Sequence, residues 1–104
     1  MDPVVPDYGG RCITGLAPAL VGAQPVDWLP TVVGGADAVV LLVLDGLGWE
    51  AVGAHPSELR TLSGLEGGPI STVAPSTTAS ALTSLATGLA PSQHGLVGFR
   101  MRFD

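Results

Sequence analysis

The sequence contains no lysine. Its four cationic side chains are all arginines, against nine aspartates and glutamates, and the formal net charge is −5. Proteins that bind nucleic acids neutralise phosphates with clusters of lysine and arginine, so we expect no nucleic-acid partner. An anionic substrate would need bound metal ions or backbone dipoles to offset the negative charge of the protein.

Cysteine and long apolar runs are equally scarce. The one cysteine, Cys12, cannot form an intrachain disulfide, so nothing indicates an oxidising compartment. The first ten residues, MDPVVPDYGG, lack the basic and apolar regions of a signal peptide. The longest apolar run, residues 38–44, is far shorter than the roughly 20 residues of a membrane helix. We therefore expect a soluble, cytoplasmic protein without membrane contact, and the oligomeric state stays open.

The order of predicted elements indicates an α/β fold. Residues 1–37 are rich in proline and predict an irregular lead-in with one helical turn near residues 16–21. The run AVVLLVL, residues 38–44, predicts a strand buried on both faces, which is typical of parallel sheets. Helices are predicted over residues 49–53 and 57–65, then a second strand over residues 69–74. A final helix completes a βαβα order, which requires a parallel sheet with a right-handed crossover.

The final helix has clear start and stop signals. Ser76 or Thr77 can act as its N-cap, Gly88 lies where a C-cap belongs, and Pro91 prevents continuation. Apolar residues at helical spacing predict the face that it buries, namely Ala79, Leu82, Leu85, Ala86 and Leu89.

The carboxyl ends of the two predicted strands hold the polar residues of interest. Asp45 follows the first strand, and the segment PSTT, residues 75–78, follows the second. Ligands of open parallel sheets bind at the carboxyl ends of strands, and neighbouring strand ends lie about 5–10 Å apart. We therefore expect the Asp45 carboxylate to face a cluster of hydroxyl groups across one crevice.

Three interpretations of this crevice remain open. Residues 46–51, GLGWEA, fit the dinucleotide-binding pattern G-x-G-x-x-A, and Glu66 follows at a suitable distance. Against it, Asp45 would place a negative charge beside the pyrophosphate. Asp45 could also simply cap the following helix. In the third interpretation, Asp45 binds a divalent cation, Gly46 permits the turn that aims it, and a hydroxyl at a helix N-terminus is the nucleophile. Metal coordination activates such a hydroxyl at neutral pH.

Three segments in order resemble one known family. They are Asp45-Gly46, then residues 75–78, PSTT, and then residues 87–95, TGLAPSQHG. This pattern resembles the alkaline phosphatase superfamily, in particular its type I phosphodiesterase and nucleotide pyrophosphatase branch, over roughly residues 38–98. The resemblance implies a three-layer α/β/α fold with a mainly parallel sheet. It further implies that only the first βαβα portion of this fold is present, with residues 38–104 as the N-terminal part of an incomplete catalytic domain.

The resemblance also implies roles for individual residues. Counting back from residues 87–88, Thr78 matches the nucleophile and also a metal ligand, with Thr77 as the runner-up. Asp45 would bind one of two divalent metal ions, usually zinc, whose remaining ligands lie outside this chain. Gly46, Pro75, Thr77 and His94 would support the site, and His94 would hold its loop without binding metal.

The predicted reaction in the full-length protein is metal-dependent hydrolysis of a phosphodiester or nucleotide pyrophosphate bond of a small molecule, through a covalent phospho-threonine. The substrate-binding residues are unknown. After Thr78, residues 79–82, ASAL, depart from the Phe-Pro-Asn-His of many relatives, which puts a nucleotide substrate in doubt. Alternatives are a phosphomonoesterase or phosphonate hydrolase on the same fold, a non-catalytic nucleotide- or dinucleotide-binding domain, and an inactive remnant. The 104-residue piece alone is expected to be inactive.

Overall fold

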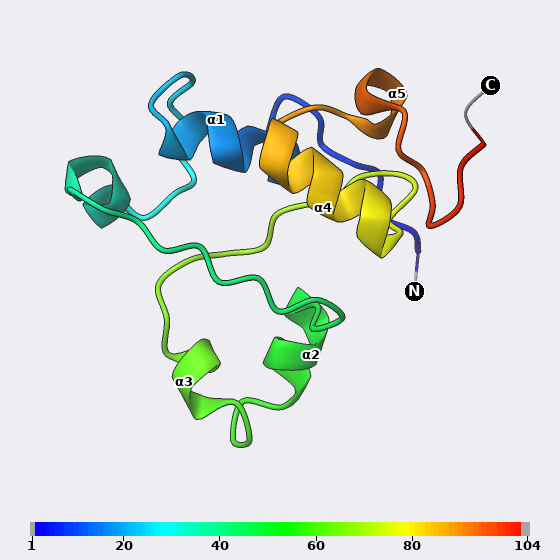
Figure 1. Cartoon of the computed structure of the whole chain (residues 1–104). Coiled ribbons are helices and arrows are strands. Elements are labelled where there is room, and N and C mark those ends of the chain that lie inside the picture. The colour runs from blue at the N-terminus through cyan, green and yellow to red at the C-terminus, as the bar shows by residue number, and fades with distance from the viewer. Residues whose placement is uncertain (1, 103–104) are drawn as a thin grey trace. The chain divides into compact units, whose positions relative to one another are not determined.

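The computed structural model describes residues 2–102, which form two compact units (Figure 1). One unit joins the segment up to Asp27 to the segment from Ile70 onward, and we call it the α4 unit after its longest helix. The other unit spans Trp28–Pro69. The helices of the α4 unit are η1 (Ile13–Gly15), α1 (Leu16–Leu20), α4 (Thr78–Thr87) and α5 (Pro91–His94). Those of the second unit are η2 (Thr31–Gly35), α2 (Trp49–Ala54) and α3 (Arg60–Ser63).

Most predicted helices are present. The turn near residues 16–21 is α1, the helix over residues 49–53 is α2, and α4 begins and ends as predicted between Thr77 and Gly88. The helix predicted over residues 57–65 shrinks to the four residues of α3. No helix within residues 2–102 has the length and apolar character required to cross a membrane.

The structure does not show the predicted parallel sheet. No strand forms within residues 2–102, although residues 12 and 71 make one isolated parallel bridge. A strand exists only through hydrogen bonds to a neighbour, and residues 38–44 have no such neighbour within their own unit. They form neither helix nor strand, and side chains such as Val40 and Leu42 are exposed. The apolar, β-branched sequence of residues 38–44 favours a strand. A strand also needs a neighbouring segment to pair with, and the local sequence does not provide one.

The predicted second strand is instead tied to the N-terminal lead-in of the same unit. Ser71 N–H donates to the Arg11 carbonyl at 2.7 Å, and Ile13 N–H donates to the Ser71 carbonyl at 3.0 Å. Three residues further on, Ala74 N–H donates to the Tyr8 hydroxyl at 3.1 Å. Residues 8–13 therefore run beside residues 71–74, immediately before the chain enters α4.

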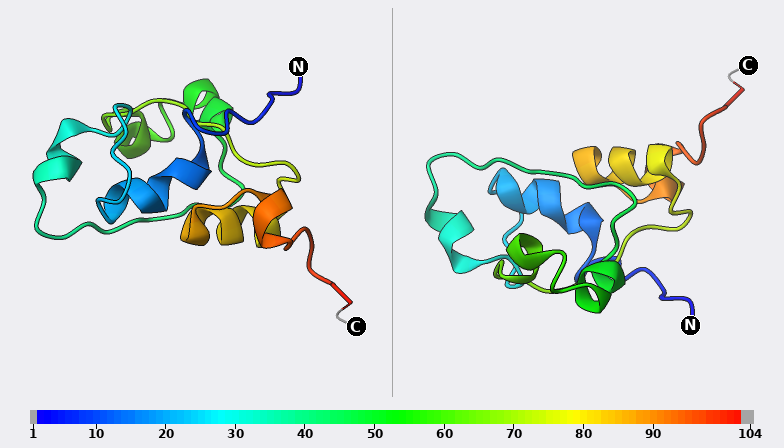
Figure 2. Two further views of the ribbon diagram at one scale, coloured as in Figure 1. Left: turned by 90° about the horizontal axis from the view of Figure 1, so that it is seen from above. Right: turned by 90° about the horizontal axis from the view of Figure 1, so that it is seen from below.

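The small core of the α4 unit lies where residues 8–13 run beside residues 71–74. Cys12 is fully buried and Val73 is 2% exposed, one from each of the paired segments. Helix α4 packs against η1, α1 and α5, and the views in Figure 2 show it running alongside α1 with α5 next to it. The lead-in, which carries none of the motifs, is thus the structural support of the helix that carries them.

The face that α4 buries differs from the predicted one. Its fully buried residues are Ser80 and Ser84, whereas Leu82 and Leu89 are 43% and 40% exposed. The reason is the close approach of the lead-in. A Cβ at Gly88 would lie 2.6 Å from Cγ of Pro18, so only small side chains fit along this side of the helix. Spaced four residues apart, the two serines and Gly88 share that side.

Candidate functional site

Asp45 lies in a tight turn of the Trp28–Pro69 unit. Leu47 N–H donates to the Leu44 carbonyl at 3.3 Å across the turn, and Gly46 has φ +78°. L residues rarely adopt this conformation, whereas glycine does so without steric cost. A Cβ at Gly46 would meet no atom within 4 Å, so a side chain would fit there. The positive φ, and not a lack of space, is therefore the reason for a glycine at this position. The turn presents Asp45 at an exposed position.

The structure overturns the interpretation of Asp45 as a helix cap. Helix α2 has Gly48 as its N-cap, and Ala51 N–H donates to the Gly48 carbonyl at 3.1 Å. Within this unit the Asp45 carboxylate makes no hydrogen bond and no ion pair. The carboxylate is therefore available to a ligand and has no structural task in its own unit.

The other predicted residues lie around the N-terminus of α4. Thr77 is the N-cap residue, with extended backbone angles of φ −60° and ψ 149°. Its hydroxyl makes no capping hydrogen bond, and it donates to the Val97 carbonyl at 3.0 Å. Pro75 lies in the exposed segment that leads into this N-cap. Because its hydroxyl already serves as a donor, Thr77 is a poorer candidate nucleophile than its neighbour.

Thr78 is the first residue of α4 and is half-buried. Its hydroxyl has no hydrogen-bond partner among the described residues of the α4 unit. The first N–H groups of an α-helix have no partner within the helix, and here the N-cap side chain does not supply one. Together with the helix dipole, these N–H groups favour an anion beside the Thr78 hydroxyl.

His94 joins the end of α5 to the middle of α4. Its Nε2 lies 2.8 Å from Oγ of the fully buried Ser84, and its Nδ1 accepts the Leu96 N–H at 3.0 Å. Because Nδ1 is the acceptor, the neutral ring carries its proton on Nε2, which donates to Ser84. Both ring nitrogens are thus occupied by protein contacts, so the imidazole holds its loop in place.

Comparison with known proteins identifies the family. The sequence profile described as "Type I phosphodiesterase / nucleotide pyrophosphatase" matches residues 39–104. This chain belongs to that family. Searches of curated proteins and of solved structures give no match.

Membership of the type I phosphodiesterase family confirms the resemblance seen in the three motif segments. It implies an α/β fold of the alkaline phosphatase type, and it supports phosphodiester hydrolysis as the class of reaction. The division into a lead-in of residues 1–37 and a catalytic part from residue 38 onward stays a prediction.

The structure brings only some of the predicted site residues together. Thr77, Thr78 and His94 belong to the α4 unit, with Pro75 directly before the helix. Asp45 and Gly46 belong to the other unit, so the predicted proximity of the Asp45 carboxylate to the Thr78 hydroxyl stays a prediction.

The residues present do not by themselves form a metal site. Within residues 2–102, no group of three or more His, Cys, Asp and Glu side chains is placed to hold a metal ion. Structural and catalytic zinc sites in proteins use at least three protein ligands.

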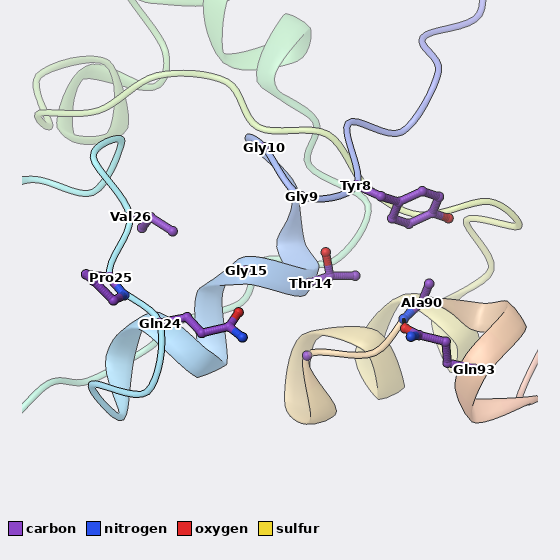
Figure 3. Close-up of a pocket in the computed structure, with 11 residues that line it drawn as sticks. Tyr8, Gly9, Gly10, Thr14, Gly15, Gln24, Pro25, Val26, Ala90 and Gln93 are labelled. Carbon is purple, nitrogen blue, oxygen red and sulfur yellow. Dashed lines mark hydrogen bonds between the residues drawn. The ribbon is translucent and has the colours of Figure 1, made fainter.

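A cavity of about 300 Å³ lies in the α4 unit, at the C-terminal end of α4 (Figure 3). Its walls come from the lead-in around Tyr8 and Thr14, from Gln24, and from Gly88 and Gln93. None of the lining side chains is a carboxylate, imidazole or guanidinium. Ten residues of helix, about 15 Å, separate this end of α4 from Thr78, so the cavity is distinct from the predicted nucleophile.

Sequence reasoning missed two contributors to the support of this helix. Tyr8 holds the chain before α4 through its hydroxyl, and no motif precedes or surrounds it. Ser84 is the buried partner of His94 and was hidden within a run of hydroxyl residues. The spacing of Ser80, Ser84 and Gly88 was the available signal, because small residues four apart indicate a close helix contact.

Proposed function

We propose that the protein hydrolyses a phosphodiester or nucleotide pyrophosphate bond of a small molecule, with Thr78 as the nucleophile. The observation that carries the proposal is the position of Thr78 at the first turn of α4, with its hydroxyl unengaged while the hydroxyl of Thr77 is engaged. The family match over residues 39–104 supports the same class of reaction.

The chemistry assigned to Thr78 is double displacement. Its Oγ attacks phosphorus and the bond from phosphorus to the leaving oxygen breaks. The proton of the threonine hydroxyl passes to the leaving oxygen, so that the leaving group departs as an alcohol or a phosphate. Water then attacks the same phosphorus and releases the threonine hydroxyl. The N–H groups of the first turn of α4 would stabilise the negative charge that develops on the phosphoryl oxygens.

We also propose that Asp45 and Thr78 are ligands of two divalent metal ions, usually zinc in this family. A bound metal would supply Lewis-acid stabilisation and a deprotonated hydroxyl. The proposal rests on the chemistry of the donors, since an exposed, unpaired carboxylate and a free hydroxyl are hard oxygen ligands. The described residues contain no group of three such side chains, so we propose that further ligands come from outside them.

The decisive experiment is covalent capture in the complete protein. A chromogenic phosphodiester is mixed with the protein, the reaction is quenched within milliseconds, and the phosphoryl adduct is located by mass spectrometry. We expect the adduct on Thr78, no adduct in Thr78→Ala, and a rate of turnover lower by about 1000-fold or more. Thr78→Ser should still form the adduct, because it keeps the hydroxyl.

Two controls separate the alternatives. Thr77→Ala should still form an adduct, and an adduct on Thr77 in the unaltered protein would overturn the assignment. Phosphomonoester and phosphonate substrates run in parallel identify the preferred bond. Binding of a dinucleotide without any hydrolysis would favour the dinucleotide-binding alternative of residues 46–51.

A further inference from the structure

The chain that leaves α4 returns to the beginning of the same helix and is bonded to it twice. After α5, His94 bonds to Ser84 in the middle of α4, at 2.8 Å. Three residues later, the Val97 carbonyl accepts the Thr77 hydroxyl at 3.0 Å. Thr77 and Ser84 are seven residues apart, about 10 Å along the helix, and lie on one side of it.

His94 also bonds to the chain directly before Val97. Its Nδ1 accepts the Leu96 N–H at 3.0 Å, one residue before the carbonyl that accepts the Thr77 hydroxyl. One side chain thus bonds to α4 on one side and to the returning chain on the other. We call these three hydrogen bonds the clasp: His94 Nε2–H to Ser84 Oγ, Leu96 N–H to His94 Nδ1, and the Thr77 hydroxyl to the Val97 carbonyl.

The Ser84 and His94 pair is not a second nucleophile and base. Nδ1 of the imidazole is an acceptor, so Nε2 carries the proton and has no lone pair with which to remove the hydroxyl proton of Ser84. Ser84 is also fully buried, and no substrate can reach it. The contact between Ser84 and His94 therefore has a structural role: it holds neighbouring residues in position.

The clasp also affects Thr78, the residue after Thr77. Because the clasp holds the Thr77 hydroxyl on the Val97 carbonyl, it keeps that hydroxyl away from the helix N-terminus and fixes the backbone from which Thr78 begins α4. A displacement of about 1 Å at a reacting atom can lower a rate by about 100-fold. The clasp is thus placed to affect the chemistry without touching substrate.

We propose that His94 is a positioning residue for the Thr78 hydroxyl and acts through Ser84 and through the bond between Thr77 and Val97. This inference rests on the proposed function, because it assumes that Thr78 is the nucleophile. The geometric part, that His94 holds the first turn of α4, stands independently of the reaction and can be measured without it.

The test is a double-mutant cycle on the complete protein. Thr77→Val removes the hydroxyl that donates to the Val97 carbonyl. It removes no helix-capping hydrogen bond, since the Thr77 hydroxyl does not cap α4. His94→Ala removes the imidazole. We expect each to slow formation of the Thr78 adduct by about 10-fold to 100-fold. Because both act through the same contact, the double variant should be no slower than the slower single variant.

A merely structural role would give a different pattern. The two effects would then multiply in the double variant, and that result would overturn the proposal.

Partial substitutions add a second check. His94→Asn keeps an acceptor for the Leu96 N–H but is too short for Ser84, and His94→Gln can reach Ser84 but not Leu96. We expect each to retain more activity than His94→Ala. Ser92→Ala removes an exposed hydroxyl from α5 and is the control that should change nothing.

Two readouts are independent of catalysis. Nitrogen chemical shifts of the His94 ring should show the proton on Nε2, and a proton on Nδ1 would refute the clasp. Hydrogen exchange of the Ala81 amide, which donates to the Thr77 carbonyl at 2.8 Å, should become about 3-fold to 10-fold faster in Thr77→Val and in His94→Ala. Unchanged exchange in both variants overturns the inference even where no adduct can be measured.

The outcomes also separate this inference from the proposed function. If Thr78→Ala still forms the adduct, the nucleophile assignment fails whatever the clasp does. If Thr78→Ala loses the adduct while Thr77→Val and His94→Ala form it at the normal rate, the proposed function stands and the clasp inference alone fails.

Discussion

Substitution of Gly88 by alanine tests the close packing that supports α4. Gly88 is the C-cap of the helix, with φ +73°, and an added Cβ would lie 2.6 Å from Cγ and 2.9 Å from Cδ of Pro18. It would also lie 3.2 Å from the Thr14 carbonyl oxygen. The substitution therefore adds both an unfavourable backbone conformation and a steric clash.

The two costs can be estimated separately. An L residue in the left-handed region costs about 1–2 kcal/mol. Overpacking against a rigid proline ring and a backbone carbonyl costs about 1–3 kcal/mol. We therefore expect Gly88→Ala to lower the free energy of unfolding by about 2–5 kcal/mol, a large share of the roughly 5–15 kcal/mol of a typical domain.

Gly95 provides a matched control for the backbone term. It has φ +77° at the C-cap of α5, but a Cβ there would meet nothing within 4 Å. Urea unfolding followed by circular dichroism should show a loss of only about 1–2 kcal/mol for Gly95→Ala. Adding Pro18→Ala to Gly88→Ala should recover part of the larger loss. Equal losses for the two glycine variants would refute the close approach of the lead-in to α4.

The remaining predictions concern hydroxyl groups of the α4 unit, each checked by urea unfolding. Tyr8→Phe removes the acceptor of the Ala74 N–H and should cost about 1 kcal/mol; an unchanged midpoint would contradict the contact. Ser80→Ala should be neutral or stabilising by up to about 1 kcal/mol, because the Ser80 hydroxyl is buried and has no hydrogen-bond partner among the described residues. Ser84→Ala should cost about 1–3 kcal/mol, because it leaves the His94 N–H unpaired; equal effects of the two serine variants would contradict this difference.

The motif residues could be predicted because their constraints are local. Gly46 occupies a turn with φ +78° and Gly88 a cap with φ +73°, conformations that favour glycine whatever surrounds them. The order of the three motif segments indicates the family from short, local patterns, and the match over residues 39–104 confirms it.

The strands and the buried face of α4 could not be predicted in the same way. A β-branched run such as residues 38–44 becomes a strand only when another segment pairs with it, and within its unit none does. The leucine pattern of α4 predicted the buried face by hydrophobicity alone. Leu82 is exposed and Ser84 buried because the closely packed lead-in admits only small side chains.

The sequence by itself determined the bounds of α4, the turn that presents Asp45 and the family to which the chain belongs, because each depends on residues adjacent or close in the chain. Only the tertiary structure decided that the lead-in around Tyr8 supports α4, and that His94 bonds to Ser84 while Thr77 bonds to Val97. Those contacts join residues 10–66 positions apart. Hydrogen bonds across such separations depend on how the chain packs, which local residue preferences do not encode.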